Sequence, residues 1–142
     1  MLSQPIKNVM KRRNFVTAPP ETTVRKAAEL MARRHVGAIV VVEGDHLVGI
    51  FSERDAVLRV VARGLEPTST RLADVMTRSP VTIAPDRSFG HAMSIMCQRG
   101  FRHLPVVDKG RPIGIVSSRR ALDPELEEFA CEERRRLRFH GE

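Results

Sequence analysis

The sequence contains no tryptophan and no tyrosine, and only six phenylalanines among its 142 residues. Proteins that bind single-stranded nucleic acid stack bases on aromatic side chains, so such a platform is poorly supplied in this chain. Helix-turn-helix and zinc-finger signatures are also missing. The net charge of +7 and the isoelectric point near 10.6 suit an anionic partner, but the basic residues are spread along the chain. The sequence therefore disfavours nucleic acid as the partner.

Cysteine is scarce, and long apolar runs are absent. The two cysteines, Cys97 and Cys131, lie in no CxxC or metal-ligand spacing, and the histidines show no ligand spacing either. We therefore expect no metal site and a reduced, cytoplasmic chain. No stretch approaches 18 consecutive apolar residues, and the N-terminal segment lacks the apolar centre of a signal peptide. We expect no membrane partner.

What the sequence does contain is an internal repeat with an offset of 65 residues. The segment Val16–Ala56 aligns with Val81–Ala121 without a gap, and 13 of the 41 positions are identical. Most other pairs are conservative, such as Leu30 with Ile95. Two copies of a unit usually pack face to face, because each leaves an apolar face that it cannot bury alone. The repeat predicts a pseudo-twofold molecule with two related clefts, and such clefts are common ligand sites.

Each repeat predicts the order β-α-β-β-α, which makes the fold class α+β. A short strand ends at proline, and apolar residues at i, i+3, i+4 and i+7 then predict helices over 24–34 and 89–99, with Met31 and Met96 buried. Apolar β-branched runs around a Gly/Asp turn predict hairpins. Their strands are expected at 38–42 and 47–51 in the first repeat and at 103–107 and 112–116 in the second.

A second helix is expected to open at Ser52, with a counterpart near Ser117. Its apolar face is predicted to contain Ala56, Val57, Val60 and Val61. We assign residues 8–64 to the first repeat and 73–123 to the second. The segment Arg63–Arg71, rich in Gly, Pro, Ser and Thr, reads as a linker. Residues 124–142 are interpreted as a solvated C-terminal helical tail.

The junction from Gly49 to Asp55 is the sharpest local signal. A glycine-containing strand runs into a helix whose first residue, Ser52, carries a hydroxyl. A helix N-terminus attracts phosphate, and the two carboxylate oxygens of Asp55 suit a ribose diol. The same spacing is close to a capping box, in which Ser52 and Asp55 would satisfy the helix's own backbone. Both interpretations stay open at this point.

Two β-α-β-β-α units, each with the late pattern G-[IV]-[FV]-[ST], resemble a tandem pair of cystathionine-β-synthase (CBS) domains, called a Bateman module. The first unit completes the pattern with Asp55. The similarity extends to the leading phrases Asn8-Val9-Met10 and Asp74-Val75-Met76, and it covers roughly residues 8–123. The resemblance implies binding of AMP, ADP, ATP or S-adenosylmethionine in a cleft between the units, and regulation of a partner protein.

The resemblance also implies roles for individual residues. Asp55 would hold the ribose and Ser52 the phosphate. Thr17 would contribute to the base pocket, and Val36, Gly37 and Ala38 would line the base with backbone. Arg102 and His103 would reach phosphates, and the alternative for His103 is a partly buried polar side chain at the start of a strand. The second copy departs from the pattern, because Ser117 is present but Arg120 stands where the aspartate would be. A guanidinium only donates hydrogen bonds, so this second cleft is expected to be empty, closed by an ion pair, or adapted to a more anionic ligand.

Two functions follow from these observations. The first is a regulatory module that binds an adenine nucleotide and modulates a partner protein, with no required cofactor. The second is a ligand-independent dimeric adaptor. In both, we expect a homodimer, since modules of this family pair through spare apolar helix surface. We predict no catalytic residues, because no catalytic domain fits beside two repeats in 142 residues.

Overall fold

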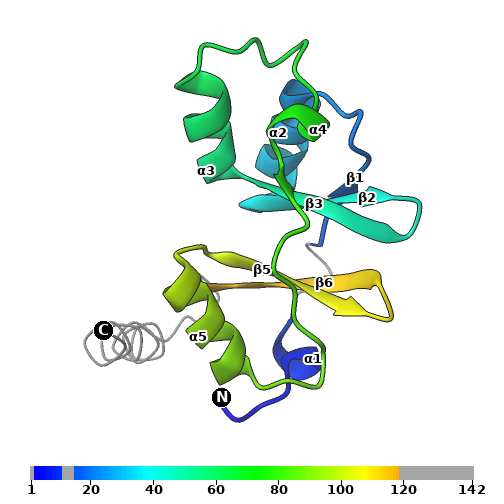
Figure 1. Cartoon of the computed structure of the whole chain (residues 1–142), viewed down its shortest axis with the longest axis vertical. Coiled ribbons are helices and arrows are strands. Elements are labelled where there is room, and N and C mark those ends of the chain that lie inside the picture. The colour runs from blue at the N-terminus through cyan, green and yellow to red at the C-terminus, as the bar shows by residue number, and fades with distance from the viewer. Residues whose placement is uncertain (1, 11–14, 119–142) are drawn as a thin grey trace.

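The computed structural model describes residues 2–10 and 15–118, in which two similar halves meet through facing sheets (Figure 1). In the first half, strand β1 (Thr17–Ala18) leads to helix α2 (Val24–Arg34) and to a hairpin of β2 (Ala38–Glu43) and β3 (His46–Ser52). The predicted limits of the helix are confirmed. The strands run slightly further than predicted, because Glu43 still pairs with His46 and Ala38 with Ser52.

The second half repeats this arrangement. Helix α5 (Phe89–Arg99) matches its predicted limits, and strands β5 (His103–Asp108) and β6 (Arg111–Ser117) form the hairpin. Both hairpins carry a register shift at the same repeat position, Val41/Val42 and Val106/Val107. The strand expected over 81–83 is reduced to one parallel bridge, Ile83 with Val106, at the position where β1 pairs Ala18 with Val41.

Equivalent residues start and stop the two long helices. Thr23 and Ser88 precede α2 and α5, and their hydroxyls accept hydrogen bonds from the Lys26 and His91 N–H groups at 3.2 and 3.1 Å. The helices end in left-handed residues, His35 and Gly100. Met31 and Met96 are 7% and 2% exposed, which confirms the predicted buried stripe.

The second helix of the first repeat differs from the prediction. It begins as α3 (Glu53–Asp55) and continues as a π-helix, η1 (Ala56–Val61), with a hydrogen bond of 2.8 Å from the Ala62 N–H to the Val57 carbonyl. Val60 is buried, but Val57 and Val61 are 57% and 71% exposed. The prediction of one shared apolar face is therefore wrong, because only Val60 and part of Ala56 reach the core. The predicted counterpart near Ser117 and the tail 124–142 lie outside the described residues.

A short helix leads into each repeat and packs on the other half. Helix α1 (Ile6–Val9) lies beside α5, and helix α4 (Leu72–Val75) lies beside α2 (Figure 1). Ile6 and Met10 belong to the apolar core of the second half. Three residues of the α4 segment belong to the core of the first half: Leu72, Val75 and Met76.

Backbone hydrogen bonds fix this exchange in the same way on both sides. The Ile6 N–H donates to the Arg87 carbonyl and the Leu72 N–H to the Thr22 carbonyl, both at 2.8 Å. Thr22 and Arg87 are equivalent positions of the repeat. The core of each half is thus completed by the short lead helix of the other repeat.

The two sheets meet through a small apolar layer. It contains Ala38, Val40, Ile50 and Ile115, each 8% exposed or less. The sheet of the first half has the order β1-β2-β3-β4, where β4 (Thr77–Arg78) lies antiparallel to β3, and the sheet of the second half is β5-β6. The fold is α+β, as predicted, with two repeats related by a pseudo-twofold arrangement.

Candidate functional site

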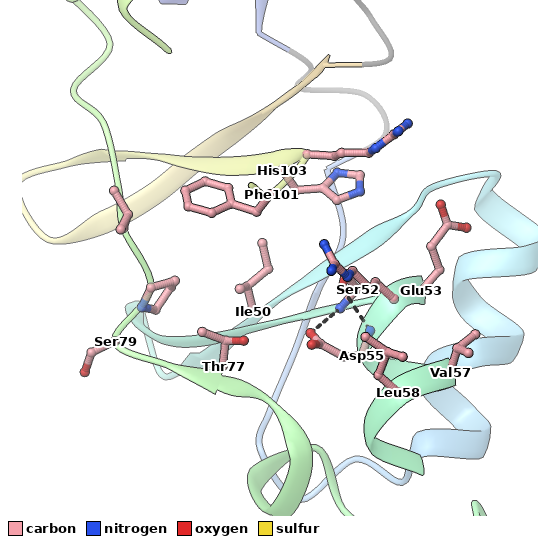
Figure 2. Close-up of a pocket in the computed structure, with 14 residues that line it drawn as sticks. Ile50, Ser52, Glu53, Asp55, Val57, Leu58, Thr77, Ser79, Phe101 and His103 are labelled. Carbon is pink, nitrogen blue, oxygen red and sulfur yellow. Dashed lines mark hydrogen bonds between the residues drawn. The ribbon is translucent and has the colours of Figure 1, made fainter. Parts of the chain in front are cut away.

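A pocket of about 810 Å³ lies between the two halves. We call it the inter-repeat pocket. Its walls come from the β3–α3 junction, the segment that enters the second repeat, and the start of β5 (Figure 2). The lining residues are Ile50, Ser52, Glu53, Arg54, Asp55, Val57, Leu58, Thr77, Ser79, Pro80, Val81, Phe101, Arg102 and His103.

The β3–α3 junction contributes Ser52 and Asp55, and both are engaged in a capping box. The Asp55 N–H donates to Ser52 Oγ at 3.2 Å, and the Ser52 N–H donates to Asp55 Oδ2 at 3.0 Å (Figure 2). The cap uses the serine oxygen as an acceptor and does not use its O–H donor. A carboxylate has about four acceptor positions, so the cap also leaves Asp55 able to accept from a ligand. Capping and ligand binding are therefore compatible in this geometry.

The apolar end of the pocket comes from residues that were not among the predicted site residues. Phe101 and Ile50 lie on opposite walls there, and Thr77 and Ser79 lie beside them (Figure 2). Ser79 has a positive φ of 45° immediately before Pro80, which is a sparsely populated conformation. The signal that could have found this wall is the leading phrase of the second repeat, since β4 follows Met76 and pairs with β3.

Three basic side chains line the other end. Arg54 Nη1 donates to the Gly100 carbonyl at 3.2 Å, which connects α3 of the first half with the end of α5 in the second. Arg102 is exposed and His103 half-buried, and both come from the entry to β5. The pocket thus has a polar end, where these basic side chains lie with the carboxylates of Glu53 and Asp55, and an apolar end.

The pocket brings together four of the predicted site residues: Ser52, Asp55, Arg102 and His103. The others lie elsewhere among the described residues. Thr17 is exposed on β1, Val36 and Gly37 precede β2, Ala38 is buried between the sheets, and Ser117 pairs with His103 at the end of β6. Arg120 lies outside the described residues.

The repeat offset explains this division. Phe101, Arg102 and His103 are the counterparts of Val36, Gly37 and Ala38, and Ser117 is the counterpart of Ser52. The prediction gives Val36, Gly37 and Ala38 to the cleft of Ser52 and Asp55, whereas it is their counterparts in the second repeat that line the inter-repeat pocket. The segment Thr77–Val81 also contributes to the wall of this pocket, and Thr17 is not among the lining residues.

Two further features concern the described residues only. Within 2–10 and 15–118, the structure contains no group of three or more His, Cys, Asp or Glu side chains that could hold a metal ion. In the same ranges, no helix has the length and apolar character needed to cross a membrane.

Comparison with known proteins places this fold in a family. The model of the CBS domain matches the chain twice, at residues 6–62 and 72–124. The uncharacterized protein MK0525 of Methanopyrus kandleri is 34% identical over 92% of this chain and 68% of its own length. Other relatives, from Arabidopsis thaliana, are much longer, and the chain spans about a fifth of their length.

Solved structures agree with this assignment. A putative signal-transduction protein with CBS domains from Burkholderia ambifaria is 32% identical and superposes with a TM-score of 0.73, over 80% of this chain and 83% of its own. The CBS domain protein PAE2072 from Pyrobaculum aerophilum, solved in complex with AMP, is 25% identical with a TM-score of 0.78, over 92% and 99% of the two chains. The chain therefore belongs to the CBS-domain family, with two CBS domains in tandem.

Proposed function

We propose that this chain is a regulatory module that binds an adenine nucleotide, AMP or a close relative, in the inter-repeat pocket and thereby modulates a partner protein. The observation that carries the proposal is the pocket's composition. Two carboxylates, a hydroxyl at a helix start and two arginines surround one end, while Phe101 and Ile50 enclose an apolar other end. The AMP complex of the Pyrobaculum aerophilum relative supports the ligand class.

In this proposal, each part of the nucleotide has a matching wall. The base lies at the apolar end between Ile50 and Phe101, where burial of its faces is favourable. The ribose diol donates to Asp55, and the phosphate accepts from the Ser52 hydroxyl and from Arg102. His103 stands at the same end and provides a further nitrogen within the pocket.

Titration calorimetry with AMP, ADP, ATP, S-adenosylmethionine and adenosine tests the ligand. Asp55→Ala is expected to weaken AMP binding by about 1.5–3 kcal/mol, the scale of hydrogen bonds to a charged group. The control is Asp74→Ala. Asp74 also accepts a hydrogen bond from a backbone N–H at a helix start, that of Arg71 at 3.3 Å, but does not line the pocket. Equal AMP affinity in wild type and Asp55→Ala would refute the ribose role.

The phosphate end has a separate test. Arg102→Ala is expected to weaken AMP more than adenosine, because its guanidinium acts on the phosphate charge. The corresponding change at Arg33, an exposed arginine of α2 outside the pocket, is the control. Absence of binding by every adenine compound would instead favour the second function.

That second function is a dimeric adaptor that needs no ligand. It is supported by the complete capping box and by the apolar side chains exposed on the second helix and just after it: Val57, Leu58, Val61 and Leu65. Under either function, we propose that a homodimer covers this surface. Light scattering at tens of micromolar tests the dimer, and a species of 16.0 kDa would contradict it.

A further inference from the structure

Arg59 lies outside the inter-repeat pocket, yet its guanidinium contacts the residue proposed to hold the ribose. Its Nε lies 3.5 Å from Asp55 Oδ1, one turn earlier on the same helix. Its Nη1 donates to the carbonyl oxygens of Val75 and Met76, both at 3.2 Å. The arginine therefore joins the Asp55 carboxylate to the end of α4.

The Asp55 carboxylate needs a second partner, because its side chain is only 14% exposed. A largely buried carboxylate is costly unless its oxygens are paired. The Ser52 N–H pairs with Oδ2 at 3.0 Å, and Arg59 lies next to Oδ1. Together these two contacts fix the rotation of the carboxylate and so determine which acceptor positions face the pocket.

The carbonyls of Val75 and Met76 hold the guanidinium in place. Carbonyls at the end of a helix lack intrahelical partners, and a cation there is favourable. Val75 and Met76 are 3% and 5% exposed, so their backbone is fixed by the apolar core of the first half. A planar guanidinium can serve the two carbonyls and the carboxylate at once, which a lysine ammonium does less well.

We propose that Arg59 is a positioning residue that orients Asp55 toward a ribose diol. This rests on the proposed function, because it takes the diol to be the partner of Asp55. In the alignment of the two repeats, Pro124 is the counterpart of Arg59, and Arg120 is the counterpart of Asp55. Only the first repeat therefore carries the aspartate together with the arginine that orients it.

The experiment compares AMP with 2′,3′-dideoxyadenosine monophosphate, which lacks the diol. Calorimetry is run on wild type, Arg59→Gln, Arg59→Lys and the control Arg71→Gln. Arg71 also pairs with an acid of its own helix turn, Asp74, at 3.2 Å, but away from the pocket. Arg59→Gln is expected to weaken AMP about tenfold and the dideoxy analogue less than about twofold, while Arg71→Gln changes neither.

Arg59→Lys keeps the charge and is expected to lose less AMP affinity than Arg59→Gln, with the same difference between the two ligands. It carries the test alone if Arg59→Gln does not fold. Equal losses for AMP and the dideoxy analogue would overturn the proposal, because a purely structural arginine would weaken both. Unchanged AMP affinity would overturn it as well. A wild type that binds no adenine nucleotide would refute the proposed function and this inference with it.

Discussion

Gly37 shows how a residue outside the pocket controls a side chain inside it. A Cβ at this position would lie 3.0 Å from His103 Cε1, 3.1 Å from His103 Nε2 and 3.2 Å from Glu53 Oε1. The imidazole of His103, which lines the pocket, therefore rests against a backbone that has no side chain. Gly37 is a spacer for His103 in this geometry, rather than a part of the pocket wall.

Gly37→Ala is expected to displace the His103 ring and to weaken AMP binding about fivefold, which corresponds to about 1 kcal/mol of overpacking. Adding His103→Ala to Gly37→Ala removes the crowded ring and should return the affinity to that of His103→Ala alone. Calorimetry on the two single variants and the double variant measures this coupling. Additive losses in the double variant would show that Gly37 does not act through His103.

A second glycine marks a limit of prediction from the sequence. A Cβ at Gly49 would lie 2.5 Å from Met76 Sδ and 3.0 Å from the Thr77 carbonyl oxygen, because the chain at the start of β4 lies close against β3, with which β4 pairs. Gly49 belongs to the predicted strand-to-helix junction, but Met76, which leaves no room for a side chain at Gly49, lies 27 residues further along the chain. Contacts of this kind depend on the pairing of two distant segments, which local patterns do not encode.

At the scale of elements, local patterns were sufficient for α2, α5 and the two hairpins. Apolar spacing, the capping hydroxyls of Thr23 and Ser88, and the turn residues are all short-range signals. Local patterns were insufficient for the pocket. Its wall at Thr77–Val81 depends on which half of the molecule each lead segment packs against. They also missed the π-helical course of η1, which leaves Val57 and Val61 in solvent.

Helix α4 begins with an ion pair between Arg71 and Asp74. Asp74 accepts hydrogen bonds from the Arg71 side chain and backbone, and these bonds hold the pKa of its carboxyl below the usual 3.8. A carboxyl whose pKa is lower in the folded state than in the unfolded state stabilises the fold when the pH is above its unfolded-state pKa. This stabilisation is lost as the pH falls through the folded-state pKa. The contribution is small, because Asp74 is exposed.

Asp74→Asn keeps a capping oxygen and removes only the charge. Its deficit in the free energy of unfolding is expected at pH 7 and at pH 5. The deficit should shrink as the pH falls below 3.8 and vanish once the pH lies below the folded-state pKa of Asp74. Urea titrations of wild type and Asp74→Asn across this range measure it, with the exposed Asp86→Asn as a control. A deficit that persisted unchanged in acid would contradict the ionic origin.

The exchange of α1 and α4 joins the two halves of the molecule, in addition to the apolar layer between their sheets. A fragment of residues 1–66 has only about as many residues as the smallest domains that fold alone. It would also lack Leu72, Val75 and Met76, three residues of its own core, while Ile6 and Met10 would lose the core that buries them. We therefore predict that the two halves are inseparable.

Circular dichroism and urea titration of the 1–66 fragment test this prediction. We expect no cooperative unfolding transition in the fragment alone, and recovery of one when residues 67–142 are added. A cooperative transition of the isolated, monomeric fragment would show that the exchanged segments are dispensable. In the intact chain, Leu72→Ala should lower the free energy of unfolding by about 2–5 kcal/mol.

The same exchange suggests how such a chain can arise by duplication. A single ancestral unit with its lead helix would have an incomplete core. Two separate copies would complete both cores by exchanging their lead helices, as in domain swapping. Fusion of the two genes turns that intermolecular trade into an intramolecular one and makes it independent of protein concentration. Once fused, the copies no longer need to be identical. One can keep an aspartate with its orienting arginine while the other carries Arg120 and Pro124 in their places.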